Sequence, residues 1–230
     1  ADQAVSRLEA KSVVTRNSDL HLRVSMRSFR AGEVSAFVSA LLRADRTQAT
    51  AHLNEFREQY PIVVTRSLEA AKRWTRQRSR GSERYGLVAT SYAERLKPHA
   101  INVRSTIDPV HWFLNDASDT RSSFYLEDPA TEYHIQGLEL DWVCVSWDAD
   151  LRMVGGQWEY KNFKSTKWQQ VKNVDRRRYL VNAYRVLLTR ARQGMVIFVP
   201  PGDPADQTRN PAFYDGTYQF LRGIGLPEIG

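Results

Sequence analysis

Apolar residues follow two alternating patterns along the chain. Short, wholly apolar runs are typical of strands buried on both faces, and they stand within residues 61–67, 85–91, 142–147 and 195–203. Elsewhere apolar residues recur every three or four positions, which predicts amphipathic helices. These cover residues 31–45, 47–60, 68–80, 174–192 and 210–225.

This alternation of strands and helices predicts one three-layer α/β domain over residues 1–230, with a mostly parallel sheet covered by helices on both faces. Ligands of such sheets collect at the carboxyl ends of the strands. Residues 102–128 interrupt the pattern as an irregular insertion. In residues 152–173, Gly155-Gly156 predicts a hairpin that leads into a basic, aromatic-rich loop. The alternating stretch 20–24 predicts an earlier strand that delivers Arg27 at its end.

Charge and cysteine content narrow the class of partner and the compartment. The chain has 33 Lys and Arg against 26 acidic residues, a net charge of +7, which favours a polyanionic partner. The single cysteine, Cys144, lies in an apolar run, so an intrachain disulfide is impossible and we expect a reducing, cytoplasmic setting. No apolar run approaches the roughly 18 residues that span a bilayer, and residues 1–11 lack a hydrophobic signal core. Because the sequence begins at Ala1, we expect a fragment of a longer protein.

Arg190 and Arg192 crowd the junction between the helix of residues 174–192 and the apolar run after it. At about 100° per residue, Arg190 falls near the border of the apolar face, so its stem can pack while its head reaches outward. A cation in the last helical turn also complements the helix dipole by about 0.3–1 kcal/mol. Spacing alone leaves both a structural and an anion-binding role open.

Two arginine-containing segments resemble helicase motifs. YRVLLTRARQGMVIF, residues 184–198, resembles motif VI of superfamily I helicases, where an LTRA segment places an arginine finger against the γ-phosphate of ATP. LRVSMRSF, residues 22–29, resembles motif IV, whose arginine is a second γ-phosphate contact. The resemblance implies that Arg190 and Arg27 are the catalytic residues.

TEYHIQGLELDWV, residues 131–143, resembles motif V of the same helicases. Tyr133 stands in place of the usual histidine. The positions in register are Thr131, Gln136, Gly137 and Glu139. By this resemblance Glu139 accepts hydrogen bonds from the nucleotide ribose, and Gln136 and Gly137 form the turn that approaches the nucleotide. An ordinary tight turn between strands is the alternative.

Together, residues 20–200 are similar to the domain-of-unknown-function 2075 family, the Schlafen-like group of DNA/RNA helicase domains. The resemblance implies a RecA-like fold and the second motor domain of a helicase or translocase. No G-x-x-x-x-G-K-[ST] loop is present in the sequence. ATP and Mg²⁺ would therefore be bound mainly by a preceding RecA-like domain of the same protein, and the chain alone would be inactive as an ATPase.

The resemblance also implies DNA or RNA, single-stranded in such motors, lying across the carboxyl ends of the strands. Short hydroxyl groups and a guanidinium suit contacts to its phosphates. The candidates there are Thr65, Arg66, Thr90, Ser91 and Thr131. In residues 158–172, aromatic residues interleave with lysines, which favours base stacking and phosphate contacts by Lys161, Lys164 and Trp168. A solvated hairpin with inward-packed aromatics is the alternative.

Two functions from other classes stay open. Asp150 followed by Glu159 and Lys161 mimics the carboxylate pair and lysine of metal-dependent nucleases. A degenerate domain kept only for binding nucleic acid is the second. The five histidines show no metal-ligand spacing, so we expect no structural metal.

Overall fold

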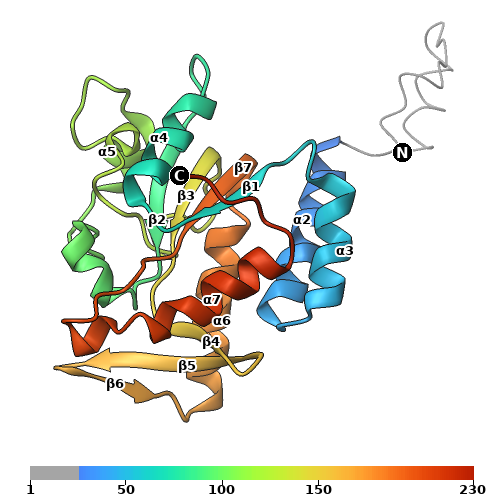
Figure 1. Cartoon of the computed structure of the whole chain (residues 1–230). Helices are drawn as coiled ribbons and strands as arrows, with labels where there is room; N and C mark the ends of the chain where they lie inside the picture. Colours follow the sequence, from blue (N-terminus) through green and yellow to red (C-terminus); the bar gives the residue numbers. More distant parts are fainter. Residues whose placement is uncertain (1–25) are drawn as a thin grey trace, which may run out of the picture.

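A four-stranded parallel sheet forms the centre of the molecule (Figure 1). The structure, a computed structural model, describes the backbone of residues 26–230 and the side chains of residues 32–230. The strands follow the order β1-β7-β3-β2. Their bounds are β1 Ile62–Thr65, β2 Tyr85–Ala89, β3 Leu140–Ser146 and β7 Ala191–Phe198. Every pairing in this sheet is parallel, which confirms the predicted α/β class and is consistent with a RecA-like three-layer fold.

Alternate side chains of β7 enter two separate cores, because neighbouring residues of a strand point to opposite faces. Met195 and Ile197 pack with one group of helices, whereas Val196 and Phe198 pack on the other face. The first face carries α2 (Met26–Leu42), α3 (Arg46–Phe56), α6 (Val174–Leu188) and α7 (Ala212–Gly223). The second face carries α4 (Leu68–Arg78) and the 3-10 helix Glu94–His99.

Cys144 lies in the second core, wholly buried in β3. Burial raises the pKa of its thiol to about 12. A thiol that stays protonated is unreactive, as the apolar run around it indicated.

The insertion of residues 102–128 is irregular but packed. It contains the short helix α5 (Pro109–Leu114) and a 3-10 turn at Ser123–Tyr125. Trp112 is buried, and its Nε1 donates to the Asp128 carbonyl oxygen at 3.0 Å. Gly86 of β2 leaves room for this indole, because a Cβ there would lie 2.7 Å from the Trp112 ring.

A second, antiparallel sheet replaces the predicted basic loop. Its strands are β4 (Leu151–Val154), β5 (Gln157–Lys164) and β6 (Lys167–Gln170). The Gly155-Gly156 turn is present as predicted, with both residues at positive φ. The chain after it forms β5 and β6 instead of a loop. Ser165 adopts φ 59° in the turn between them, a conformation that is uncommon for serine and that the sequence did not predict.

The start of the described chain differs from the expectation for motif IV. The predicted strand at residues 20–24 lies outside the described residues. Arg27 belongs to the first turn of α2, so the backbone there is helical, and its side chain is outside the described part. Among the described residues, no helix combines the length and the apolar character needed to cross a membrane.

The small sheet is docked on α7 through a close approach of two backbones. The Met153 N–H donates to Thr217 Oγ1 at 3.0 Å. Beside this bond, a Cβ on Gly216 would collide with the Met153 carbonyl oxygen. Only glycine at this helical position lets β4 lie against the helix.

Gly216→Ala should therefore lower the free energy of unfolding by about 1–3 kcal/mol, because a backbone must shift to admit the methyl group. Gly32→Ala is the matched control, since Gly32 is also helical and a Cβ there meets nothing within 4 Å. The control should be neutral or stabilising by up to about 1 kcal/mol. Urea denaturation measures both, and equal stabilities of the two variants would contradict the close approach.

Candidate functional site

Arg190 and Glu139 lie next to each other at the amino-terminal edge of the central sheet. Arg190 stands between α6 and β7, and Glu139 directly precedes β3. The Leu140 N–H donates to the Arg190 carbonyl oxygen at 3.0 Å, which ties together the starts of two neighbouring strands. The residues predicted to contact the γ-phosphate and the ribose thus share one edge, although they are distant in the sequence.

The Arg190 side chain is half-buried and anchored at its base. Its Nε donates to the Val186 carbonyl oxygen at 3.2 Å, and Thr189 Oγ1 donates to the Arg185 carbonyl oxygen at 2.8 Å. Within the described part of the chain, its two terminal nitrogens have no hydrogen-bond partner. A guanidinium with a fixed stem and an unengaged head is suited to reach an anion outside the domain.

Among the described residues, the carboxylate of Glu139 is held by one exposed ion pair. Arg192 Nε lies 3.7 Å from Glu139 Oε2, with exposed side-chain fractions of 41% and 59%. Arg192 also lies 3.7 Å from Asp141. Pairs this open contribute about 0–1 kcal/mol, so Glu139 can exchange its partner for ribose hydroxyls at little cost.

Gln136 and Gly137 form an exposed turn before β3. The Leu138 N–H donates to the Ile135 carbonyl oxygen at 3.0 Å, and Gly137 has φ 86°. That conformation favours glycine, whereas a Cβ would meet nothing within 4 Å. The structure therefore explains Gly137 by its backbone angle and leaves the space beside it open.

Three predicted phosphate contacts at the carboxyl edge already have partners inside the protein. Thr65 Oγ1 accepts from the Ser67 N–H at 3.1 Å. Thr90 Oγ1 donates to Asp150 Oδ2 at 2.7 Å, and the Ser91 hydroxyl donates to Glu132 Oε1 at 2.6 Å. Both threonines are buried. The Thr90 and Ser91 hydroxyls bind the end of β2 to segments distant in the sequence, whereas the Thr65 bond is local.

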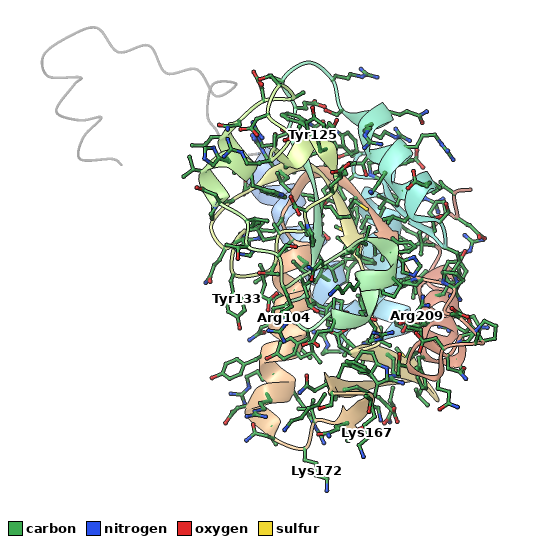
Figure 2. The ribbon with its side chains drawn as sticks, turned by 90° about the vertical axis from the view of Figure 1, so that its left-hand side faces the viewer. Arg104, Tyr125, Tyr133, Lys167, Lys172 and Arg209 are labelled. Carbon is green, nitrogen blue, oxygen red and sulfur yellow. The ribbon has the colours of Figure 1, made fainter. Side chains whose placement is uncertain are left out.

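Arg66 and Thr131 are engaged in the same way. The Arg66 guanidinium donates to the Pro200 carbonyl oxygen and to Asp215, each at 2.6 Å, and lies 4.2 Å over the Tyr218 ring. Thr131 is buried, with its hydroxyl 3.0 Å from His134 Nδ1. The exposed residue of this turn is Tyr133, which projects from the surface in Figure 2.

The aromatic residues of the small sheet face inward, as the alternative of a solvated hairpin proposed. Trp158 is buried, stacks on Trp147 at 5.4 Å and donates to the Leu41 carbonyl oxygen at 3.0 Å. Trp168 packs on Phe163 at 5.2 Å and donates from Nε1 to the Thr208 carbonyl oxygen at 2.8 Å. Their rings therefore pack within the protein and are not exposed for stacking on bases.

The basic residues of this sheet are placed differently. Lys164, Lys167 and Lys172 are exposed, and Figure 2 shows Lys167 and Lys172 projecting from the end of the molecule that carries the small sheet. Lys161 Nζ lies 3.0 Å from Glu159 Oε2 and is largely covered. This sheet can thus attract a polyanion through the positive charge of its exposed lysines.

Two carboxyl groups that follow β3 are buried together at the carboxyl edge. Asp150 Oδ1 accepts from the Tyr184 hydroxyl at 2.5 Å, and Asp148 Oδ1 accepts from the Tyr214 hydroxyl at 3.1 Å. Burial raises the pKa of Asp148 to about 6, and burial together with the charge of Asp148 raises that of Asp150 to about 7. Sequence reasoning missed this network, whose signal in the sequence was a pair of aspartates, Asp148 and Asp150, after an apolar strand.

The geometry gives the nuclease hypothesis no support. Both oxygens of Asp150 accept hydrogen bonds, and its backbone carbonyl pairs with the Lys161 N–H at 2.7 Å. Within the described residues, the one group of possible metal ligands is Glu33, His52 and Glu55, on α2 and α3. Asp150 and Glu159 are not part of that group.

A comparison with protein families identifies the family of this chain. A family model for the Schlafen group 3 DNA/RNA helicase domain matches residues 2–201. The chain belongs to this family. No curated protein and no solved structure matches the chain. For a Schlafen group 3 helicase domain, a helicase-like role that involves nucleic acid is the expected class, and the Schlafen-like part of the sequence resemblance is confirmed.

The buried carboxyl pair of this helicase domain predicts an unusual pH dependence of stability. Both pKa values are raised in the folded state, so between about pH 4 and pH 7 the folded chain binds more protons than the unfolded chain. These groups therefore stabilise the fold below pH 4 and lose that contribution as the pH rises towards 7.

Asp150→Asn should remove up to one proton of this linkage, a slope of about 1.4 kcal/mol per pH unit. Its unfolding free energy relative to wild type should thus increase between pH 4 and pH 8. Asp175→Asn, an exposed change on α6, should stay within about 0.5 kcal/mol of wild type. Guanidinium titrations at several pH values measure the difference, and parallel curves for wild type and Asp150→Asn would refute it.

Proposed function

We propose that this domain is the second motor domain of an ATP-dependent DNA or RNA helicase or translocase. The observation that carries the proposal is the shared edge of Arg190 and Glu139, joined by the Leu140 to Arg190 backbone bond. Family membership adds the helicase class. A single edge that offers a guanidinium head with no partner among the described residues, beside a carboxylate, suits a nucleotide with its anionic phosphates and its ribose hydroxyls.

In this proposal ATP and Mg²⁺ are bound mainly by a preceding RecA-like domain of the same protein. Arg190 meets the γ-phosphate across the interface and stabilises the charge that develops during phosphoryl transfer. Arg27, in the first turn of α2, is the second candidate contact. The domain alone has no ATPase activity, because it contributes the finger and lacks the phosphate-binding loop.

The nucleic acid, single-stranded in this proposal, crosses the carboxyl edge of the sheet and the small sheet beside it. Support comes from the exposed lysines there, including Lys164. Since the hydroxyls of Thr65, Thr90, Ser91 and Thr131 and the Arg66 guanidinium have internal partners, their part in binding is to shape this edge.

Arg190→Ala should lower nucleic-acid-stimulated ATP hydrolysis by the full-length protein about 1,000-fold or more, as removal of an arginine finger does in related phosphoryl transfer. Arg27→Ala should cause a loss in the same direction. Arg178→Ala is the matched control, because Arg178 is an exposed arginine on the same helix α6 at its other end.

A steady-state phosphate-release assay measures the rates, and thermal unfolding checks that each variant is folded. Wild-type turnover by Arg190→Ala would show that Arg190 does not act as an arginine finger. If the full-length wild type bound polynucleotide and hydrolysed no ATP, the domain would be a noncatalytic binding module instead.

Glu139→Gln should raise the KM for ATP about threefold to tenfold with little change in kcat. The reason is that glutamine keeps a neutral acceptor, so the variant loses about 1 kcal/mol, the difference between a charged and a neutral hydrogen bond, and ribose is not the reacting group. The same variant should lose less affinity for 2′,3′-dideoxy-ATP, which has no ribose hydroxyls to donate. An equal loss of affinity for both nucleotides would show that Glu139 does not bind the ribose.

A further inference from the structure

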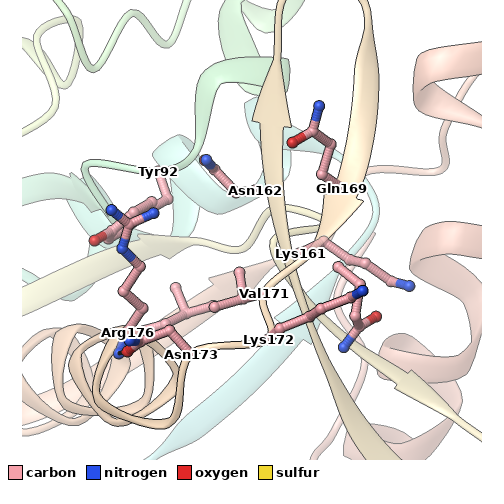
Figure 3. A pocket seen from close by; sticks show the side chains of 10 residues that line it. Tyr92, Lys161, Asn162, Gln169, Val171, Lys172, Asn173 and Arg176 are labelled. Atoms are coloured by element: carbon pink, nitrogen blue, oxygen red, sulfur yellow. Dashed lines mark hydrogen bonds between the residues drawn. The ribbon is translucent and has the colours of Figure 1, made fainter.

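A polar pocket opens where three separate segments meet at the carboxyl edge of the central sheet (Figure 3). Tyr92 contributes from the segment after β2, the small sheet contributes β5 and β6, and the start of α6 closes the pocket. Its volume is about 480 Å³. This is within the range of about 300–1,000 Å³ that small organic ligands occupy.

The charged residues that line this pocket are all cations: Lys161, which is paired with Glu159, Lys172 and Arg176. Arg176 and Lys172 are exposed, and neither has a carboxylate partner within the described part of the chain. Asn173 caps α6 by accepting from the Arg176 N–H at 2.9 Å, so the positive end of the helix dipole lies at the same rim. An anionic group is therefore the favoured part of any ligand.

Side-chain amides line the pocket beside these cations. Asn162, Gln169 and Gln170 have no side-chain hydrogen bonds to other described residues. An amide offers both donors and an acceptor in one plane. A site for bare phosphate needs donors only, since amide oxygens repel an anion. Amides in this number suit a planar heterocycle with donors and acceptors along its edge.

Apolar groups complete the lining. Leu180 is buried and Val171 half-buried, and the Tyr92 ring is half-buried at the opposite side. In Figure 3 the Arg176 guanidinium lies beside the Tyr92 side chain, so an aromatic ring and a cation flank the same space. Burial, and then the nearby Tyr133 and Glu132, raise the pKa of Tyr92, which keeps its hydroxyl protonated as a donor.

We propose that this pocket binds one whole nucleotide, with its base against the amides and Tyr92, beside the Arg176 guanidinium, and its phosphate at Lys172. The nucleotide is either a free nucleoside 5′-monophosphate or a residue unstacked from a single strand that crosses this edge. The strand-bound form rests on the proposed function, whereas the binding of a free mononucleotide does not. The assignment adds a discrete recognition point to a surface otherwise made of exposed lysines.

The first test titrates the chain with uridine and adenosine 5′-monophosphates, with the matching nucleosides and with inorganic phosphate, by calorimetry. Mononucleotide should bind more tightly than either part alone. Lys172→Ala and Arg176→Ala should each weaken it about tenfold, as expected for a lost charged hydrogen bond. Arg178→Ala, which removes the same charge two residues away and outside the lining, should change binding less than twofold.

A second variant tests the base contacts. Asn162→Ala combined with Gln169→Ala should weaken mononucleotide binding and leave the weak binding of inorganic phosphate unchanged. If inorganic phosphate or an acidic peptide bound as tightly as mononucleotide, or if the double variant had no effect, the pocket would be a simple anion site and the proposal would be overturned.

The strand-bound source is tested with an oligothymidine that carries 2-aminopurine at one position at a time. A rise in fluorescence at one register, lost in Arg176→Ala and kept in Arg178→Ala, identifies a base unstacked into the pocket. If mononucleotide binds and no register brightens, free nucleotide is the source. Neither assay uses ATP hydrolysis, so the two proposals can fail separately. A full-length protein without ATPase activity but with an intact fluorescence signal would refute the proposed function alone. Absence of both mononucleotide binding and a fluorescence change would refute the pocket alone.

Discussion

The pairing of β3 with β7 is the constraint on which both ends of this domain depend. Its register fixes Val143 opposite Met195 and Ser146 opposite Phe198. Before the paired segment, the Leu140 to Arg190 bond sets the positions of Glu139 and Arg190. After it, β3 continues directly into the buried Asp148 and Asp150. A slip of one residue would reverse the faces of a strand that is buried on both sides and separate the features at each edge.

Helix α6 turns this pairing into a connection between the two edges. It has 15 residues, about 22 Å at 1.5 Å per residue, and it runs antiparallel to β7, which follows it. Its first turn borders the polar pocket, its last turn is bound by Arg190 through the Val186 carbonyl oxygen, and Tyr184 between them is bound to Asp150. The buried hydroxyl to carboxyl bond fixes the middle of the helix relative to the carboxyl edge.

The central fold was predictable because buried parallel strands and amphipathic helices leave strong patterns in sequence. Cys144 and the Met195–Phe198 run show this, since their apolar neighbours allow no other environment. The hydroxyls at the strand ends were harder. Thr90 and Thr131 have the residue type that contacts phosphates, yet Thr90 meets its partner Asp150 through tertiary packing, and Thr131 meets His134 within its own turn. The second turn of the small sheet could not be predicted from the sequence either, because its residue at positive φ is Ser165 and not a glycine.

Those internal partners change where nucleic acid can be held. A hydroxyl that already donates to a buried carboxyl group, as Thr90 does, would leave Asp150 unsatisfied if it turned towards a phosphate, at a cost of about 1–3 kcal/mol. Lys172 and Arg176 carry no such penalty, since both are exposed and reach outward. The physics of desolvation thus favours the rim formed by the small sheet and the start of α6 over the strand ends themselves. The strand ends serve that rim by holding Tyr92 and α6 in place through Glu132 and Asp150.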